Sequence, residues 1–239
     1  MEEAAHQSDM KFCYCTLALG EKYVELARIF LDSYLKNVHT DTPVVIVTDH
    51  SSTIVDHPSV IQYKHNTSII GAPISLKWLP YRHALSEGYD NICFIDIDSV
   101  VDSSYDEQSI INNAQDGLGC NWFIKYEQNF TKQSRGASKL RALVNEQDKY
   151  PIVCPVECFM FLTGERSRSI RFINEWHRVQ QQLTEHKLYK REVCHEIGLA
   201  ASRTGVPVYK YKGGRTTYTD NFTHYGTGAG KRKMIQDAK

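Results

Sequence analysis

Two aspartates, Asp96 and Asp98, follow the apolar run from Ile92 to Ile95 and are the clearest candidates for chemistry in this sequence. The run has the composition of a buried strand, and alternation along a strand places both carboxylates on one face. Two carboxylates this close repel each other, and a divalent cation that prefers oxygen ligands, such as Mg²⁺ or Mn²⁺, relieves the repulsion. The pair therefore predicts a metal site with positions left for phosphate oxygens. The alternative, that both side chains only cap a turn, stays open.

A glycine-rich basic segment near the C-terminus is the second candidate. Glycine lets the backbone approach a phosphate closely, and Lys231 and Arg232 supply positive charge. The segment is not a Walker A loop, because Tyr225 stands where glycine is required and Arg232 where Ser or Thr must follow the lysine. A neutral His224 is a candidate third ligand for the cation of the aspartate pair. The competing interpretation is a disordered basic tail.

Alternating strands and helices must position these groups. Apolar runs predict strands over 12–19, 43–48, 55–63 and 92–101, and helical spacing predicts helices over 21–37 and 75–87. Further along, strands are expected over 118–125, 152–163 and 206–211, and helices over 132–150, 166–182 and 192–204. This order is typical of an α/β fold with a mostly parallel central sheet flanked by helices, which binds ligands at the carboxyl ends of its strands.

The chain shows no internal repeat and no interdomain linker, so we predict a mobile tail over 1–10 and a single domain over 11–233. Residues 212–233 are rich in glycine, threonine and basic residues. We expect them to become ordered only around a bound ligand.

The order of these segments resembles the GT-A fold of nucleotide-sugar-dependent glycosyltransferases, particularly the glycogenin-like and lipopolysaccharide-galactosyltransferase group. The resemblance covers residues 11–233 and implies a Rossmann-like GT-A domain. Four stretches carry it, namely 14–49, 75–82, 94–99 and 224–231. They look like the family's nucleotide-binding start, the segment before its metal motif, its Asp-x-Asp strand and its His-x-x-Gly-x-x-Lys segment. The sequence departs from the family in the last stretch, where the glycine spacing is shifted by one position, and in lacking the Asp-Gln-Asp of many retaining members.

The resemblance implies roles for several residues. Asp96, Asp98 and His224 would bind Mn²⁺ or Mg²⁺. Asp96 would also take part in binding the nucleotide-sugar donor. The donor diphosphate would be bound by basic residues, namely Lys77, Lys231 and Arg232. Base and ribose would be bound at the ends of the first two strands, by Thr16, Ala18 and Asp49.

A carboxylate is also needed beside the transferred sugar, to stabilise positive charge or to deprotonate the acceptor. Glu196 is similar in position to the catalytic glutamate in the His-Asp-Glu segment of blood-group-type transferases. Glu157 interrupts the apolar run from Pro155 to Phe161, where an acid needs a partner or a function. An ion pair with a nearby arginine is the other reading of Glu157. The expected reaction moves a sugar from a nucleotide-diphosphate sugar, with UDP as the expected nucleotide, to an acceptor hydroxyl with retention.

Composition excludes several classes of protein. With 41% hydrophobic and 23% charged residues, the chain is globular rather than disordered or coiled-coil. It has no apolar run long enough to span a membrane, and because its first ten residues are polar and acidic we expect no secretory signal. Four of its seven cysteines, Cys13, Cys15, Cys93 and Cys158, lie in apolar runs. Reduced core thiols are therefore expected, and with them a cytoplasmic location.

The charges are unevenly distributed. Residues 1–119 carry 7 basic and 17 acidic side chains, whereas residues 120–239 carry 21 basic and 11 acidic ones. Basic residues gather over 125–141 and favour a polyanionic acceptor, either a modified nucleic-acid base or a phosphorylated glycan. The other reading of this asymmetry is two solvated surfaces of opposite sign. Two other function classes also stay open: a nucleotidyltransferase, and a non-catalytic protein that binds a sugar nucleotide or nucleic acid.

Overall fold

The computed structural model describes residues 11–66, 76–121, 123–125, 143, 152–155, 159–185, 193–211, 222–226 and 228–238. The predicted N-terminal tail and the predicted helix over 132–150 lie outside these residues, apart from residue 143.

A seven-stranded mixed sheet forms the centre, in the order β10-β6-β9-β4-β1-β2-β3. Its strands are β1 (Phe12–Ala18), β2 (Val44–Thr48), β3 (Val60–Lys64), β4 (Asn91–Ile95), β6 (Gly117–Cys120), β9 (Phe159–Thr163) and β10 (Val208–Lys210). Neighbouring strands are parallel except around β9, which runs antiparallel to both β4 and β6. The predicted α/β class with a mostly parallel sheet is confirmed.

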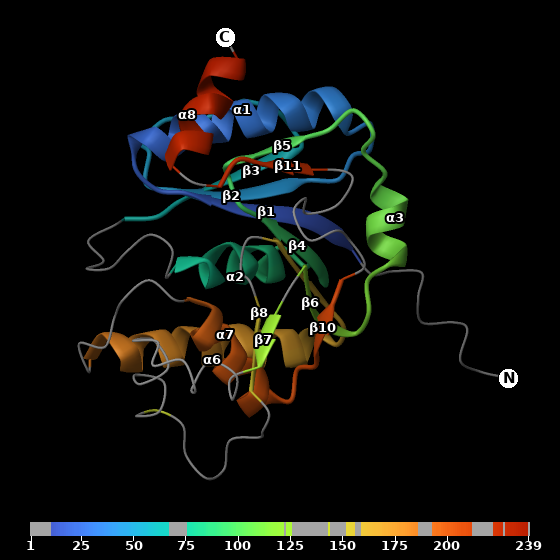
Figure 1. Cartoon of the computed structure of the whole chain (residues 1–239), viewed down its shortest axis with the longest axis vertical. Coiled ribbons are helices and arrows are strands. Elements are labelled where there is room, and N and C mark those ends of the chain that lie inside the picture. The colour runs from blue at the N-terminus through green and yellow to red at the C-terminus, as the bar shows by residue number, and fades with distance from the viewer. Residues whose placement is uncertain are drawn as a thin grey trace, which may run out of the picture.

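Helices cover both faces of the sheet (Figure 1). One face carries α1 (Glu21–Asn37) and α8 (Gly228–Asp237), and the other carries α2 (Trp78–Ser86), α6 (Arg166–Glu185) and α7 (Val193–Thr204). A short helix, α3 (Glu107–Asn112), adds Ile110 to the core on the α1 side. Because side chains alternate along a strand, Tyr14 of β1 packs into the core under α1, while Cys13 and Cys15 pack into the core under α2.

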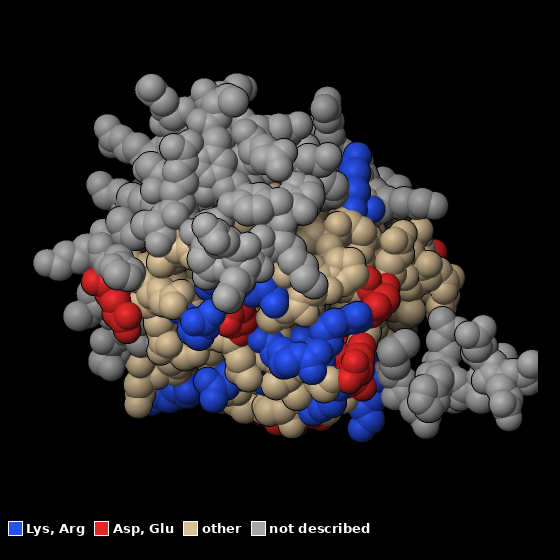
Figure 2. All heavy atoms as spheres, turned by 90° about the horizontal axis from the view of Figure 1, so that it is seen from below, with Lys and Arg blue, Asp and Glu red and all other residues tan. Residues whose placement is uncertain are grey.

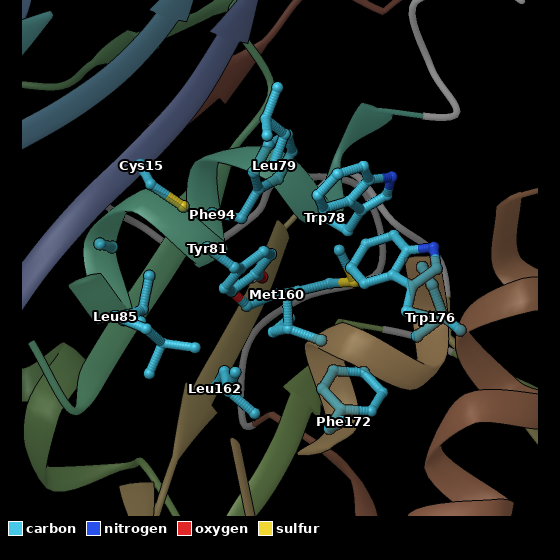
Figure 3. Packing of buried hydrophobic residues seen from close by; sticks show 14 of the residues in the cluster. Cys15, Trp78, Leu79, Tyr81, Leu85, Phe94, Met160, Leu162, Phe172 and Trp176 are labelled. Atoms are coloured by element: carbon cyan, nitrogen blue, oxygen red, sulfur yellow. The ribbon is translucent and has the colours of Figure 1, made fainter. Parts of the chain in front are cut away.

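The core under α2 fixes the position of that helix (Figure 3). The ring of Tyr81 lies between Phe94 of β4 and Trp176 of α6, with centroid distances of 5.9 and 6.1 Å. Its hydroxyl donates a hydrogen bond of 3.0 Å to the carbonyl oxygen of Met160. This packing holds Lys77, the residue directly before α2, at a fixed place beside the end of β4.

Two short ladders lie outside the main sheet. β5 (Ser99–Val101) pairs antiparallel with β11 (Phe222–His224), and β7 (Phe123–Lys125) pairs antiparallel with β8 (Val153–Pro155). The predicted single strand over 92–101 is wrong, because β4 ends at Ile95 and a turn separates it from β5. Asp96 and Asp98 therefore lie in a turn and not on one face of a strand.

The end of the chain is more regular than its composition suggests. β11 and α8 form within residues 222–238, and α8 continues past residue 233 to Asp237. Phe222 and Met234 are both buried in the core under α1, with exposed fractions of 0% and 1%. These two apolar anchors explain why a segment rich in glycine and lysine packs onto the domain.

Three of the predicted core thiols are confirmed: Cys13, Cys15 and Cys93 are free and buried, and burial raises the pKa of each. Cys158 lies outside the described residues. None of the described helices is both long and apolar enough to cross a membrane.

Candidate metal centre

Two distant parts of the chain meet at the turn that follows β4. In the β5–β11 ladder His224 is paired with Ser99, and the backbone N–H of Tyr225 donates a hydrogen bond of 2.9 Å to the carbonyl oxygen of Asp98. This register places the His224 ring beside the turn. One ligand atom from each of Asp96, Asp98 and His224 then lies within 4.8 Å of the others. The three predicted metal ligands are therefore brought together.

Asp98 has two cationic or proton-donating neighbours. Nε2 of His224 lies 3.1 Å from its Oδ1, and Nζ of Lys231 lies 3.2 Å from its Oδ2. Burial alone would raise the pKa of the Asp98 carboxyl, but the hydrogen bonds and charges of His224 and Lys231 outweigh burial and lower the pKa. Asp98 is therefore ionised at neutral pH, the state that a metal ligand needs.

Asp96 pairs with the lysine at the start of α2. Nζ of Lys77 lies 2.6 Å from Oδ1 of Asp96, and 5.2 Å from the centroid of the Phe94 ring. Only 7% of the Lys77 side chain and 20% of the Asp96 side chain are exposed. The pair is thus shielded from water, and the packing of α2 places the backbone of Lys77 beside the end of β4.

Lys231 approaches from the opposite side, on α8. Its Nζ lies 4.8 Å from the centroid of the Tyr23 ring of α1, as well as beside Asp98. Burial lowers the pKa of Lys231, but the Asp98 carboxylate outweighs this and raises it. The turn from β11 to α8 includes Gly226 with a φ of 61°, a left-handed conformation that glycine adopts without strain. This turn sets the position of Lys231.

A pocket lies over these groups. Its polar lining consists of Lys77, Asp96, Asp98 and Lys231, and its apolar lining of Leu17, Leu19, Tyr23, Phe94 and Ile97. The sequence alone did not single out any of the apolar residues. Only Tyr23 carried a signal, because it lies in the first turn of the helix that directly follows β1, at the carboxyl edge of the sheet.

The residues predicted to bind base and ribose are not part of this lining, although Thr16 and Ala18 are direct neighbours of Leu17 in β1. Thr16 and Ala18 are fully buried in β1, and the Thr16 hydroxyl donates a hydrogen bond of 2.7 Å to the carbonyl oxygen of Ile95. Oδ1 of Asp49 accepts a hydrogen bond of 2.8 Å from the backbone N–H of Gly20. Their role in nucleotide binding stays a prediction, as does that of Arg232, which is exposed on α8 beside Lys231.

Thr16→Val tests the role of Thr16. Valine keeps the shape but removes the buried hydrogen bond to Ile95, so we expect the free energy of unfolding to fall by about 1 kcal/mol. Nucleotide affinity should fall as well if the hydroxyl also binds the ligand, and should stay unchanged if it serves the fold alone. Urea unfolding and a nucleotide titration measure the two quantities, with Thr184→Val, at an exposed position of α6, as the control. Weaker nucleotide binding at unchanged stability would instead assign Thr16 to the ligand.

The proposed catalytic carboxylates are not placed in the pocket by the described residues. Glu196 lies in the first turn of α7 and is 3% exposed, and the pocket lining described above does not include it. Glu157 lies outside the described residues. The catalytic role of both glutamates therefore stays a prediction.

The face that carries α6 bears many charges of both signs (Figure 2). Four of its described arginines lie in ion pairs, namely Arg166–Asp90, Arg168–Asp116, Arg178–Glu175 and Arg203–Glu175. Arg171 of α6 is exposed and donates a hydrogen bond to the Ser167 hydroxyl. Glu175 is shared by Arg178 and Arg203, so three acids partly neutralise these four arginines. The basic group over 125–141 falls where side chains are not described.

Comparison with known proteins adds no relative: no protein-family model matches the sequence, and no curated protein matches it. An inference about activity therefore depends on the site itself.

Proposed function

We propose that the protein is a metal-dependent glycosyltransferase of the GT-A type. It would move a sugar from a nucleotide-diphosphate sugar, with UDP as the expected nucleotide, to an acceptor hydroxyl with retention. The observation that carries the proposal is the cluster of Asp96, Asp98 and His224 at the carboxyl ends of parallel strands. The two aspartates also line a pocket together with Lys77 and Lys231. Open α/β sheets bind their ligands at this edge.

The donor set suits the cation that such a reaction uses. Carboxylate oxygens favour Mg²⁺ and Mn²⁺, and a neutral imidazole nitrogen is a common metal ligand. Here Asp96 and Asp98 offer two carboxylates and His224 offers one imidazole, with one ligand atom from each within 4.8 Å of the others. When bound, the ion supplies positive charge that stabilises the leaving diphosphate.

The chain's own residues would do the rest. Lys77 and Lys231 present ammonium groups to the same pocket and would bind phosphate oxygens by charge-assisted hydrogen bonds. The apolar side chains that line the pocket, among them Leu17 and Phe94, would keep water away from the reacting centre. Glu196 and Glu157 are the candidates for the carboxylate beside the sugar. The acceptor we propose is a glycan or a modified nucleic-acid base.

A panel of nucleotide sugars, assayed for hydrolysis with Mn²⁺, tests this proposal without knowledge of the acceptor. We expect one donor to release its nucleoside diphosphate, and EDTA to stop the release. Release of pyrophosphate from a nucleoside triphosphate would instead identify a nucleotidyltransferase. Binding of a nucleotide sugar without turnover on any offered acceptor would identify a non-catalytic binding protein.

A further inference from the structure

Each carboxylate of the candidate metal centre has a lysine as its counter-ion, and the two lysines come from opposite sides of the sheet. Lys77 lies 2.6 Å from Asp96 beside α2, and Lys231 lies 3.2 Å from Asp98 on α8. The ammonium-bearing side chains are only 7% and 18% exposed. Such shielded pairs are screened by salt much less than pairs on the surface.

The charges of these four groups balance, and this balance constrains what can bind. A divalent cation that takes both carboxylates as ligands must compete with two ammonium groups, and it leaves two excess positive charges in a partly buried pocket. Uncompensated charge away from water is costly. A diphosphate diester brings two negative charges at neutral pH, and a free nucleoside diphosphate such as UDP brings between about two and three. The oxygens of both accept hydrogen bonds from lysine. The cation and the diphosphate together restore neutrality, whereas either alone does not.

We propose, on the basis of the function proposed above, that Lys77 and Lys231 are exchangeable counter-ions that make cation and diphosphate bind cooperatively. Each lysine pairs with its aspartate until a divalent cation takes the carboxylate, and then turns to the phosphates. The two lysines thus oppose binding of the cation alone and favour binding of the diphosphate. Because coupling between two ligands is reciprocal, each ligand raises the affinity for the other by the same factor.

The surroundings of the lysines allow this exchange. Both side chains line the pocket together with the aspartates. Each ammonium group also lies near an aromatic ring, 4.8 Å from the centroid of Tyr23 for Lys231 and 5.2 Å from that of Phe94 for Lys77. A ring face stabilises an ammonium group that is not fully paired with a carboxylate. Small side-chain rotations then suffice to redirect the ammonium groups.

Removal of one lysine distinguishes this exchange from a purely structural ion pair. If Lys231 only fixes α8 beside the centre, Lys231→Met should weaken the binding of the cation and of the diphosphate alike. If Lys231 competes with the cation, the same change should strengthen binding of the cation alone and weaken binding of the diphosphate. The opposite signs of the two effects are the signature of the exchange.

The experiment measures Mn²⁺ binding to the full chain by the electron paramagnetic resonance signal of free Mn²⁺, with and without UDP. The Mn²⁺–UDP complex formed in buffer is measured separately and subtracted. For Mn²⁺ alone, we expect Lys231→Met to lower the dissociation constant by about fivefold or more relative to the wild type. UDP should tighten Mn²⁺ binding by about tenfold in the wild type and by much less in Lys231→Met.

Two further variants complete the design. Lys233→Met removes an exposed lysine from the same helix and should behave as the wild type. Lys77→Met repeats the test through Asp96 in case α8 detaches in the first variant, and circular dichroism checks that each variant is folded.

Each other outcome is decisive. If Lys231→Met and Lys77→Met bind Mn²⁺ no more tightly than the wild type, while Asp98→Asn loses the ion, the metal centre stands and the exchange is wrong. If neither the wild type nor the lysine variants bind Mn²⁺, the metal centre is wrong, and the proposed function with it.

Discussion

Asp98→Asn is expected to lower the turnover of the donor at least about 100-fold, because a bound ion stabilises leaving-group charge by several kcal/mol. Asparagine keeps the shape of the side chain but removes the charge that binds the cation. It also removes the negative partner of His224 and Lys231, which lie 3.1 and 3.2 Å away. Steady-state turnover with Mn²⁺, together with Mn²⁺ binding, measures the effect.

The matched control is Asp116→Asn, which removes a carboxylate of the same type from the ion pair with Arg168 on α6. Asp116 is absent from the pocket lining described above, so turnover should stay at the wild-type value. Equal turnover in the wild type and Asp98→Asn would rule out a metal centre at this turn.

Gly230→Ala is expected to displace α8 and to lower turnover by about 100-fold, since a shift of about 1 Å in a positioning group can cost that much. A Cβ atom on Gly230 would overlap the carbonyl oxygen of Tyr225, part of the backbone that joins β11 to α8. Neither backbone can yield without moving Lys231, the next residue. We also expect the free energy of unfolding to fall by about 1–3 kcal/mol from overpacking. Donor turnover and thermal unfolding measure the two effects.

Gly228→Ala provides the comparison within the same helix, because a Cβ atom there meets no atom within 4 Å. Alanine favours helix over glycine by up to about 1 kcal/mol, so this variant should be as stable as the wild type or more stable. Similar losses in both variants would mean that helix flexibility, and not the close approach at Gly230, controls the site.

Most of the fold could be predicted because it depends on local patterns. The bounds of α1 follow from the helical spacing of Tyr23, Leu26, Phe30 and Tyr34, and the structure gives the same 17 residues. The break after Ile95 could not be predicted, because Ile97, Val100 and Val101 continue the apolar pattern across the turn. The antiparallel direction of β9 could not be predicted either. It depends on the pairing of β9 with β4 and β6, which are distant from it in the sequence, and local patterns do not encode such pairing.

The charged residues of the candidate site were easier to predict than the apolar residues that line its pocket. Charged side chains such as Asp96 and Asp98 stand out after an apolar run, whatever the backbone does between them. Leu17, Leu19 and Phe94 look like core residues in the sequence, and only the shape of the folded chain exposes them to a pocket. The pairing of His224 with Ser99 was hidden for a similar reason, since a ladder of three residues on each side carries almost no periodic signal.

The β5–β11 ladder also determines when, during synthesis of the chain, the candidate site can form. All seven strands of the main sheet precede residue 211, whereas His224 follows Asp98 by 126 residues. At a translation rate of about 5–20 residues per second, His224 is added roughly 6–25 s after Asp98. A nascent chain would thus contain every strand of its sheet while Asp98 still lacked both His224 and Lys231. The candidate metal centre would therefore be completed only after every strand of the main sheet has been synthesised.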